Sequence, residues 1–287
     1  MARDESAAVD EVLVRYGRER LLHRLSLSPH VDRFVLKGAA LFHLWTDSPH
    51  RPTRDIDLLG FGSLEAGEVE DIFREICSVP VEPDGLEFDA ATVRAEEIRG
   101  GSDYGGVRVK LLANLGRARV NLQVDVGIGD AVRPSPVLIR YPTILTDLQA
   151  PELRAYPREA VVAEKTHAIV KLGLVNSRMK DYYDLYVLCR EFEFEGSTLC
   201  EALLATFSRR KTALPDGVPS GLSEAFADDA TKQKQWRSFV ARGQLAYGEV
   251  SVGSVVSALR DFLSPALNSL AQDETLDRRW PPGGPWL

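Results

Sequence analysis

The stretch Phe34-Val-Leu-Lys37-Gly38-Ala-Ala-Leu41, followed by Arg51-Pro-Thr-Arg-Asp55-Ile-Asp57-Leu-Leu59, decides the fold of the first half of the chain. It predicts a short buried strand, a glycine turn, a helix over residues 39–45 and a second strand that begins with two aspartates. Side chains of a strand alternate between its two faces, so aspartates at i and i+2 point to the same side.

Two carboxylates on one face repel each other unless a cation lies between them. Mg²⁺ suits such an all-oxygen site, because one or two carboxylates hold it while substrate phosphates and water complete its coordination. A glycine turn that leads into a helix start adds free backbone N–H groups and the positive end of a helix dipole. The sequence therefore predicts a site for Mg²⁺ and phosphate together.

The chain has 287 residues, enough for two domains of ordinary size. It contains no apolar run near the roughly 18 residues of a membrane helix, and its start is polar rather than signal-like. We expect a cytoplasmic protein that does not contact a membrane. Its three scattered cysteines, Cys77, Cys189 and Cys200, predict reduced core thiols rather than disulfides or a zinc site.

The formal net charge is −7, of which residues 1–150 carry −6 and residues 151–287 carry −1. This negative charge argues against binding of nucleic acid over a broad basic surface. Any nucleic acid must therefore bind at a local basic patch, and its affinity should depend only weakly on salt. The candidate patches are Arg108, Lys110, Arg117 and Arg119 around one hairpin, Arg178 with Lys180, and Arg209-Arg-Lys211. A solvated surface is the alternative for each patch.

The remaining periodicity predicts a helix over residues 5–27, whose arginines we expect on a solvated face, and another over 64–79. Strands are then expected over residues 86–93, 107–112 and 119–127, with a further short strand over 141–145. In the third of these, Asn121, Gln123 and Asp125 alternate with aliphatic residues, which predicts one polar face.

After Pro151 and Pro157 the pattern becomes helical. Helices are expected over residues 160–174, 180–190, 199–207, 223–242 and 251–273, followed by an irregular tail from residue 278. In the second of these helices Lys180, Asp181 and Asp184 are three to four residues apart and are expected to share a face.

Three aspartates on neighbouring strands, a glycine turn and a helical second half resemble the DNA polymerase β-type nucleotidyltransferase superfamily. Within it the chain resembles the AbiEii toxin family of type IV toxin–antitoxin and abortive-infection pairs. Five blocks in the family's order carry the resemblance: Lys37-Gly38-Ala-Ala-Leu41, Arg51-Pro-Thr53-Arg-Asp55-Ile-Asp57, Leu122-Gln123-Val-Asp125-Val-Gly127, Glu164-Lys165-Thr-His-Ala168 and Arg178-Met-Lys180-Asp181-Tyr-Tyr-Asp184-Leu185.

This resemblance implies an α/β (α+β) fold, with a mixed-sheet nucleotidyltransferase domain over residues 1–150. A helical domain over residues 151–287 is expected to complete the active-site cleft. The implied activity is Mg²⁺-dependent transfer of NMP from an NTP to an acceptor hydroxyl, expected at the 3′ end of tRNA or another RNA. The implied partner is a cognate antitoxin, expected to be a winged-helix regulator.

Carried over residue by residue, the resemblance makes Asp55 and Asp57 metal ligands and gives catalytic roles to Lys165 and Asp184. Asp125 lies on the polar face of a later strand, where the superfamily has a third carboxylate. We therefore expect Asp125 to be the third metal-binding and catalytic carboxylate. The expected nucleotide-binding residues are Lys37, Gly38, Ala39, Lys180 and Asp181.

The chain departs from the family at its glycine turn, where Ala39 and Ala40 follow Gly38 in place of a second glycine and a hydroxyl residue. This change removes a hydroxyl expected at a nucleotide phosphate and leaves the backbone donors in place. It supports one alternative, a nucleotide- or partner-binding protein that is catalytically weak. A second alternative is nucleotidylation or phosphorylation of a protein.

Each residue also has a purely structural interpretation. Asp55, Asp57 and Asp125 would then be solvated residues at strand or loop ends. Lys180, Asp181 and Asp184 would be a surface ion-pair cluster, a frequent role of helix charges at this spacing. The joint order of the five blocks favours the functional interpretation over these.

Overall fold

The computed structural model describes residues 9–46, 51–62, 64–98, 105–242 and 245–287. The chain forms two compact units. The first contains Met1–Asp130 and Pro136–Tyr156, and the second contains Ala131–Ser135 and Pro157–Leu287. The division into functional domains at residues 150 and 151 stays a prediction.

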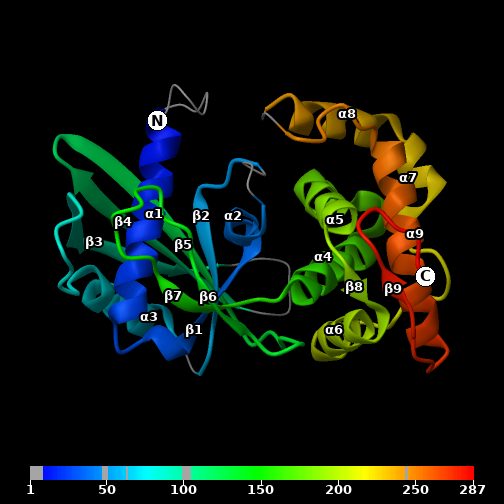
Figure 1. The fold of residues 1–287 in the computed structure, drawn as a ribbon, viewed down its shortest axis with the longest axis horizontal. Coiled ribbons are helices and arrows are strands. Elements are labelled where there is room, and N and C mark those ends of the chain that lie inside the picture. Colours follow the sequence, from blue (N-terminus) through cyan, green and yellow to red (C-terminus); the bar gives the residue numbers. More distant parts are fainter. Residues whose placement is uncertain (1–8, 47–50, 63, 99–104, 243–244) are drawn as a thin grey trace. The chain divides into compact units, whose positions relative to one another are not determined.

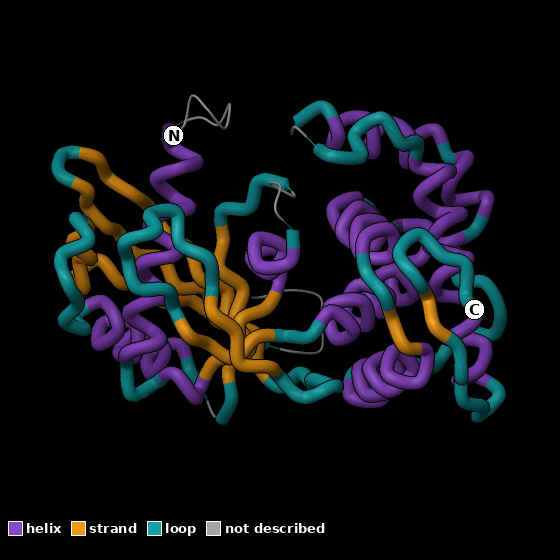
Figure 2. The backbone as a smooth tube through the Cα atoms, viewed as in Figure 1, coloured by secondary structure: helices purple, strands orange, loops and turns teal. Residues whose placement is uncertain are grey.

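The first unit is built on a mixed sheet with the strand order β3-β4-β5-β2-β1-β7-β6 (Figures 1 and 2). Its strands are β1 Phe34–Lys37, β2 Asp55–Gly60, β3 Leu86–Glu97, β4 Gly106–Leu115, β5 Ala118–Ile128, β6 Val137–Arg140 and β7 Glu152–Ala155. Its helices are α1 Val9–Leu27, α2 Phe42–Trp45 and α3 Ala66–Cys77. Parallel pairing joins β2 to β5 and β1 to β7, and the other neighbours are antiparallel.

Helices α1 and α3 cover one face of this sheet. Gly17 lets α1 lie directly on β5, because a Cβ at this residue would be 3.1 Å from Val120 and 3.2 Å from Leu122. The amphipathic α3 buries Val69, Phe73 and neighbouring apolar side chains against the sheet. The predicted alternation of β5 is confirmed, since Val120, Leu122, Val124 and Val126 are buried and the residues between them are not.

Two of the expected local structures are different. The predicted helix over residues 39–45 is a 3-10 turn, Gly38–Leu41, followed by the single α-helical turn of α2. The predicted strand over residues 141–145 is wrong, because the strands of this region are β6 and β7 and Tyr141 is buried in the connection between them. Tertiary packing, rather than local propensity, decides this short segment.

The arginines of α1 do not form a solvated face, so that prediction is wrong. Arg18 and Arg20 are 2% exposed and Arg24 is 5% exposed. Asp84 offsets the cost of burying two of these charges: Arg24 donates to both of its carboxylate oxygens, at 2.7 and 3.1 Å, and Arg20 donates at 3.0 Å. The helix is therefore enclosed on its charged side as well as on its apolar side.

The second unit is helical apart from one small sheet (Figure 1). Its helices are α4 Arg158–Leu172, α5 Met179–Glu191, α6 Gly196–Arg209, α7 Glu224–Asp228, α8 Ala230–Val240 and α9 Val252–Ala271. Helix α5 is at the centre, with its residues 181–189 buried and with α4, α8 and α9 packed around it. The helix predicted over residues 223–242 is divided, because Asp229 is extended and caps α8 through Lys232 N.

The end of the chain is more regular than predicted. Strand β9 Arg279–Trp280 pairs with β8 Phe194–Glu195. Trp280 and Trp286 pack on Phe262 with ring centroids 5.0 and 6.0 Å away, and their indole N–H groups donate to Cys189 O and Phe262 O. This aromatic cluster fastens the C-terminal segment to the helical core.

The prediction of reduced core cysteines is confirmed, since Cys77, Cys189 and Cys200 are buried and free. Burial raises the pKa of the Cys77 and Cys189 thiols to about 12. Of the helices in the described ranges, none is long and apolar enough to span a bilayer.

Candidate active site

The strand register brings together the first-half residues singled out from the sequence. On β2, Asp57 lies opposite Lys37 of β1 on one side and opposite Asp125 of β5 on the other. Directly opposed residues of neighbouring strands point to the same face, and such strands are about 4.8 Å apart. Lys37, Asp57 and Asp125 therefore form a continuous row on the face that is not covered by α1, with Arg108 of β4 next in line.

Gly38 packs directly against Asp57. Its φ of +74° lies in the left-handed region, where a side chain is strained. A Cβ at this residue would also lie 2.8 Å from the Asp57 Cβ and closer still to the carboxylate. The glycine turn thus serves two purposes, since it reverses the chain after β1 and leaves room for the carboxylate of Asp57.

Asp125 is held by Arg108, which the sequence suggests only as a member of a basic patch. Arg108 donates to both oxygens of Asp125 at 2.8 Å, and Gln123 Nε2 donates at 3.3 Å. The bond to Asp125 raises the pKa of the Arg108 guanidinium above its ordinary value, so Arg108 remains charged. Any metal that used Asp125 would have to share this carboxylate with Arg108.

A second cation, Arg18, lies near the aspartates from the side of α1. Its guanidinium donates to Thr53 O just before β2, while its buried Nε has no partner among the described residues. Burial lowers the pKa of Arg18, and the charges of Asp57 and Asp55 partly oppose that shift. A signal for this residue existed in the sequence, because Arg18 shares a 3.6-residue stripe with Val14, Leu21 and Leu25.

Lys37 is held at the edge of the row, with Nζ 3.1 Å from Asp130 Oδ2 and 5.6 Å from the centre of the Tyr156 ring. Its side chain is 15% exposed. Ala39 and Ala40 are buried, 7% and 1% exposed, so the side chains of the altered turn face the core. The turn presents backbone rather than side-chain groups at this place.

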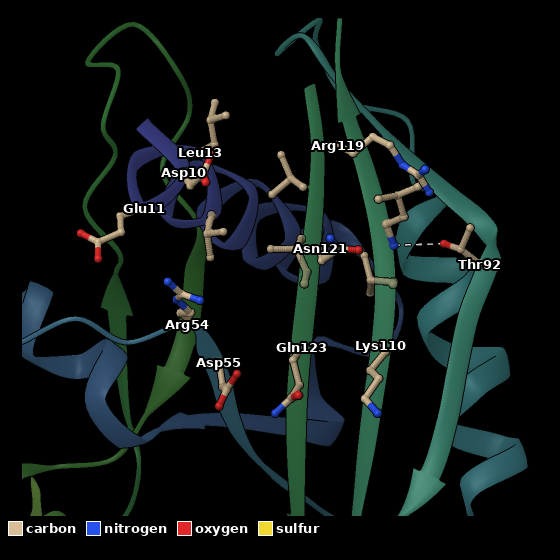
Figure 3. Close-up of a pocket in the computed structure, with 15 residues that line it drawn as sticks. Asp10, Glu11, Leu13, Arg54, Asp55, Thr92, Lys110, Arg119, Asn121 and Gln123 are labelled. Atoms are coloured by element: carbon tan, nitrogen blue, oxygen red, sulfur yellow. Dashed lines mark hydrogen bonds between the residues drawn. The ribbon is translucent and has the colours of Figure 1, made fainter. Parts of the chain in front are cut away.

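A groove of about 670 Å³ begins at Asp55 and follows the N-terminal half of β5. Figure 3 shows Asp10, Glu11 and Leu13 of α1 with Arg54 on one side, and Asn121, Gln123 and Lys110 of the sheet on the other. β2 begins at Asp55, opposite Gln123, whereas β5 begins at Ala118. The groove therefore lies where β5 extends beyond its neighbour β2.

The donor set of the row fits a magnesium ion only in part. In the described ranges no three His, Cys, Asp or Glu side chains are arranged as a complete metal site. Asp55 and Asp57 share one face of β2 and provide oxygen donors, which matches the one or two carboxylates with which proteins bind Mg²⁺ when phosphates complete the shell.

In the second unit, Lys165 of α4 joins two aspartates of α5. Its Nζ is 2.9 Å from Asp181 Oδ1 and 2.6 Å from Asp184 Oδ2. Arg178 Nε is 2.6 Å from the other oxygen of Asp181. The Asp181 and Asp184 side chains are 1% and 0% exposed. The cluster is therefore buried, which excludes the alternative that these helix charges form an ion pair on the surface.

Electrostatics favour the ionised form of Asp181. Burial acts to raise the pKa of Asp181, but the charges of Lys165 and Arg178 outweigh burial and hold that pKa below its ordinary value. Lys180 is exposed and takes no part in these contacts, whereas Asp181 and Asp184 are buried, so the three side chains expected on one face have different environments. The spacing of four residues places Lys180 one turn before Asp184, so burial rather than helical position distinguishes them.

The sequence model of the family described as "Nucleotidyl transferase AbiEii toxin, Type IV TA system" matches residues 20–251. No curated protein matches the chain. Two solved structures from Helicobacter pylori are similar in fold. One is a putative nucleotidyltransferase (TM-score 0.54, 14% identity, 93% of this chain and 99% of that one). The other is JHP933 (TM-score 0.53, 13% identity, 93% and 97%).

Proposed function

The chain belongs to the AbiEii nucleotidyltransferase toxin family of type IV toxin–antitoxin systems. From this premise we propose that it transfers NMP from an NTP to the 3′ hydroxyl of an RNA acceptor, tRNA in the first place, with Mg²⁺ and release of pyrophosphate. The observation that carries the proposal is the packing of the Gly38 turn directly against Asp57, within the row that continues to Asp125. The turn proposed to bind phosphate and the carboxylate pair are thus adjacent.

The β1 end of the row is suited to the triphosphate. The Gly38 turn leads into the 3-10 turn Gly38–Leu41, whose first backbone N–H groups would be donors for phosphate oxygens. Lys37 adds a positive charge beside Asp57. Because Ala39 and Ala40 are buried, recognition at this turn uses backbone donors and does not need the missing hydroxyl.

Asp55 and Asp57 would hold Mg²⁺, which when bound neutralises triphosphate oxygens. Asp125 is the proposed third carboxylate, next to Asp57, where it would orient the acceptor hydroxyl. Arg108 holds the Asp125 carboxylate in place through two hydrogen bonds. Phosphoryl transfer depends on such positioning and charge neutralisation more than on covalent chemistry.

Lys165 and Asp184 are proposed to act in the same reaction, because they occupy the C-terminal motifs of the family. Asp181 holds Lys165 in position together with Asp184. Lys180, exposed one residue before Asp181, remains a proposed nucleotide contact.

Membership of a type IV toxin–antitoxin family implies an antitoxin partner. We propose that this partner is a winged-helix regulator, as the family resemblance suggested.

The proposal is tested by incubating the protein with each labelled NTP in turn, Mg²⁺ and total tRNA. We expect one or more nucleotides to label RNA, and Asp57→Asn to reduce the label by at least 100-fold, because it removes a carboxylate proposed to hold Mg²⁺. Arg140→Ala, an exposed substitution on β6, serves as the matched control and should retain activity.

Other outcomes would overturn the proposal in distinct ways. Label that appears on a protein hydroxyl instead of RNA would assign the chain to protein nucleotidylation. Nucleotide that binds with no transfer to any acceptor would indicate a binding protein. Transfer that survives Asp57→Asn unchanged would remove the carboxylate pair from the mechanism.

A further inference from the structure

We propose that the groove between α1 and the β4–β5 hairpin binds the single-stranded 3′ end of the nucleic-acid acceptor. This inference rests on the proposed function, because it specifies where the acceptor of that reaction lies. The groove has a volume of about 670 Å³ and is lined only by residues of the first unit.

The first argument is the direction of the reaction. In phosphoryl transfer the attacking and leaving oxygens lie on opposite sides of the phosphorus. The sheet order is β4-β5-β2-β1, so the Gly38 turn and the β5 groove flank the β2 carboxylates on opposite sides. If pyrophosphate leaves on the side of Gly38, the acceptor hydroxyl must approach over β5.

The second argument is charge. Arg54, Lys110 and Arg119 line the groove, and Arg54 and Arg119 have no ion-pair partner among the residues that the structure describes. The Lys110 side chain is 58% exposed, and its Nζ lies 2.6 Å from Glu96 Oε1. Lys110 and Arg119 lie on the β4–β5 side of the groove and Arg54 lies across from them, below Asp10 and Glu11. The three cations therefore match a path for phosphates that runs along the β4–β5 side and reaches Arg54 next to Asp55.

The third argument is the polar chemistry of the groove walls. Asn121 and Gln123 alternate along the face of β5 that also carries Asp125, and side-chain amides can form paired hydrogen bonds with base edges. From Asp125 to Arg119 the strand runs roughly 20 Å, enough for a few nucleotides. Among the described residues no aromatic side chain lines the groove, so stacking contributes little and binding should be weak.

These features predict a small but measurable salt dependence. Three phosphate contacts to a single strand give a slope of about −2 in log K against log salt, and loss of one contact should reduce the slope by about 0.7. Arg119→Ala should raise the KM for acceptor RNA about tenfold while the KM for NTP stays unchanged. Arg140→Ala on β6, at the other end of the sheet, is the matched control that keeps both constants and the slope.

A second measurement does not depend on catalysis. Asn121 is exposed, and the three native cysteines are buried, so Asn121→Cys introduces a single accessible thiol into the groove. We expect a short single-stranded RNA that ends in CCA to slow alkylation of this thiol severalfold. NTP alone and a blunt RNA duplex should not slow it.

The results separate this inference from the proposed function. Protection of the thiol by RNA in a protein that transfers no nucleotide would leave the groove assignment standing and overturn the function. Transfer to RNA without thiol protection, and with an unchanged acceptor KM in Arg119→Ala, would overturn the groove assignment alone. Protection by a peptide acceptor but not by RNA would also overturn it.

Discussion

At the scale of single residues, the candidate site depends on how closely Gly38 approaches Asp57. The glycine combines a positive φ with a position where a Cβ would press on the carboxylate. Because the two requirements coincide, the glycine fixes the orientation of a proposed metal ligand as well as the path of the chain. A positive φ alone would also permit asparagine at this position, but the close approach to Asp57 leaves no room for any side chain.

Gly38→Ala should therefore impair function beyond its effect on stability. The left-handed backbone costs about 1–2 kcal/mol in a residue with a Cβ, and displacement of Asp57 by about 1 Å should reduce transfer on the order of 100-fold. Thermal unfolding and the RNA-labelling assay measure the two effects separately.

Gly116 provides the matched control for this prediction. It also has a positive φ, +58°, but a Cβ there would meet nothing within 4 Å. Gly116→Ala should lose comparable stability and keep its transfer activity. Equal losses of activity in both variants would show that backbone strain, rather than contact with Asp57, matters at Gly38.

At the scale of elements, α1 contributes more than an amphipathic cover for the sheet. It buries a network of charges in which Asp84 pairs with Arg20 and Arg24, and it directs Arg18 towards the start of β2. His23 lies in the same network and is 3% exposed. Burial, and then the charges of Arg20 and Arg24, lower the pKa of His23 to about 4, against the opposing effect of Asp84.

This histidine should make the stability of the fold depend on pH. Its pKa is lower in the folded state than the ordinary 6.5, so the unfolded state binds the proton first as the pH falls. Stability should be lost between about pH 6.5 and pH 4, with a loss on the order of 2 kcal/mol between pH 7 and pH 5.

Denaturant unfolding at pH 7 and pH 5 checks this prediction. His23→Leu removes the titrating group and keeps an apolar side chain, so its stability should change less between the two pH values than that of the wild type. An unchanged pH dependence in the variant would assign the effect to other groups.

At the scale of the whole molecule, each compact unit carries its own set of motif residues. The first contains the row from Lys37 to Arg108, and the second contains the cluster of Lys165, Asp181 and Asp184. Within its unit, the second cluster joins α4 to α5 through a buried ion pair. A structural role and a catalytic role therefore overlap in Lys165, and a single substitution cannot separate them.

A triple variant separates them. Lys165→Met alone removes a cation shared by two buried carboxylates, of which Asp181 keeps Arg178, and should cost about 3–5 kcal/mol of unfolding free energy. Adding Asp181→Asn and Asp184→Asn removes the uncompensated charge and should restore most of this stability. If Lys165 and Asp184 act in transfer, the stable triple variant should remain inactive.

Denaturant unfolding and the RNA-labelling assay on the same samples provide the comparison. Return of activity together with stability would mean that the cluster only holds α4 against α5.

The sequence by itself determined the local architecture around the aspartates. Strand alternation, a glycine and its following turn are properties of neighbouring residues, so Asp55 and Asp57 could be assigned to one face of β2 without a structure. The same reasoning found the polar face of β5 and the boundaries of most helices to within a few residues. The five motif blocks also predicted the family.

Only the tertiary structure decided which charges meet. Arg108 with Asp125, Arg24 with Asp84, and Lys165 with Asp184 are 17, 60 and 19 residues apart, and no local pattern distinguishes these partners from other charged residues. Whether a charged side chain is buried depends on what packs over it. This is why the α1 arginines were wrongly predicted to be solvated, and why spacing did not separate the exposed Lys180 from the buried Asp181 and Asp184. Burial is a property of the assembled fold, and periodicity reports only which face of an element a residue occupies.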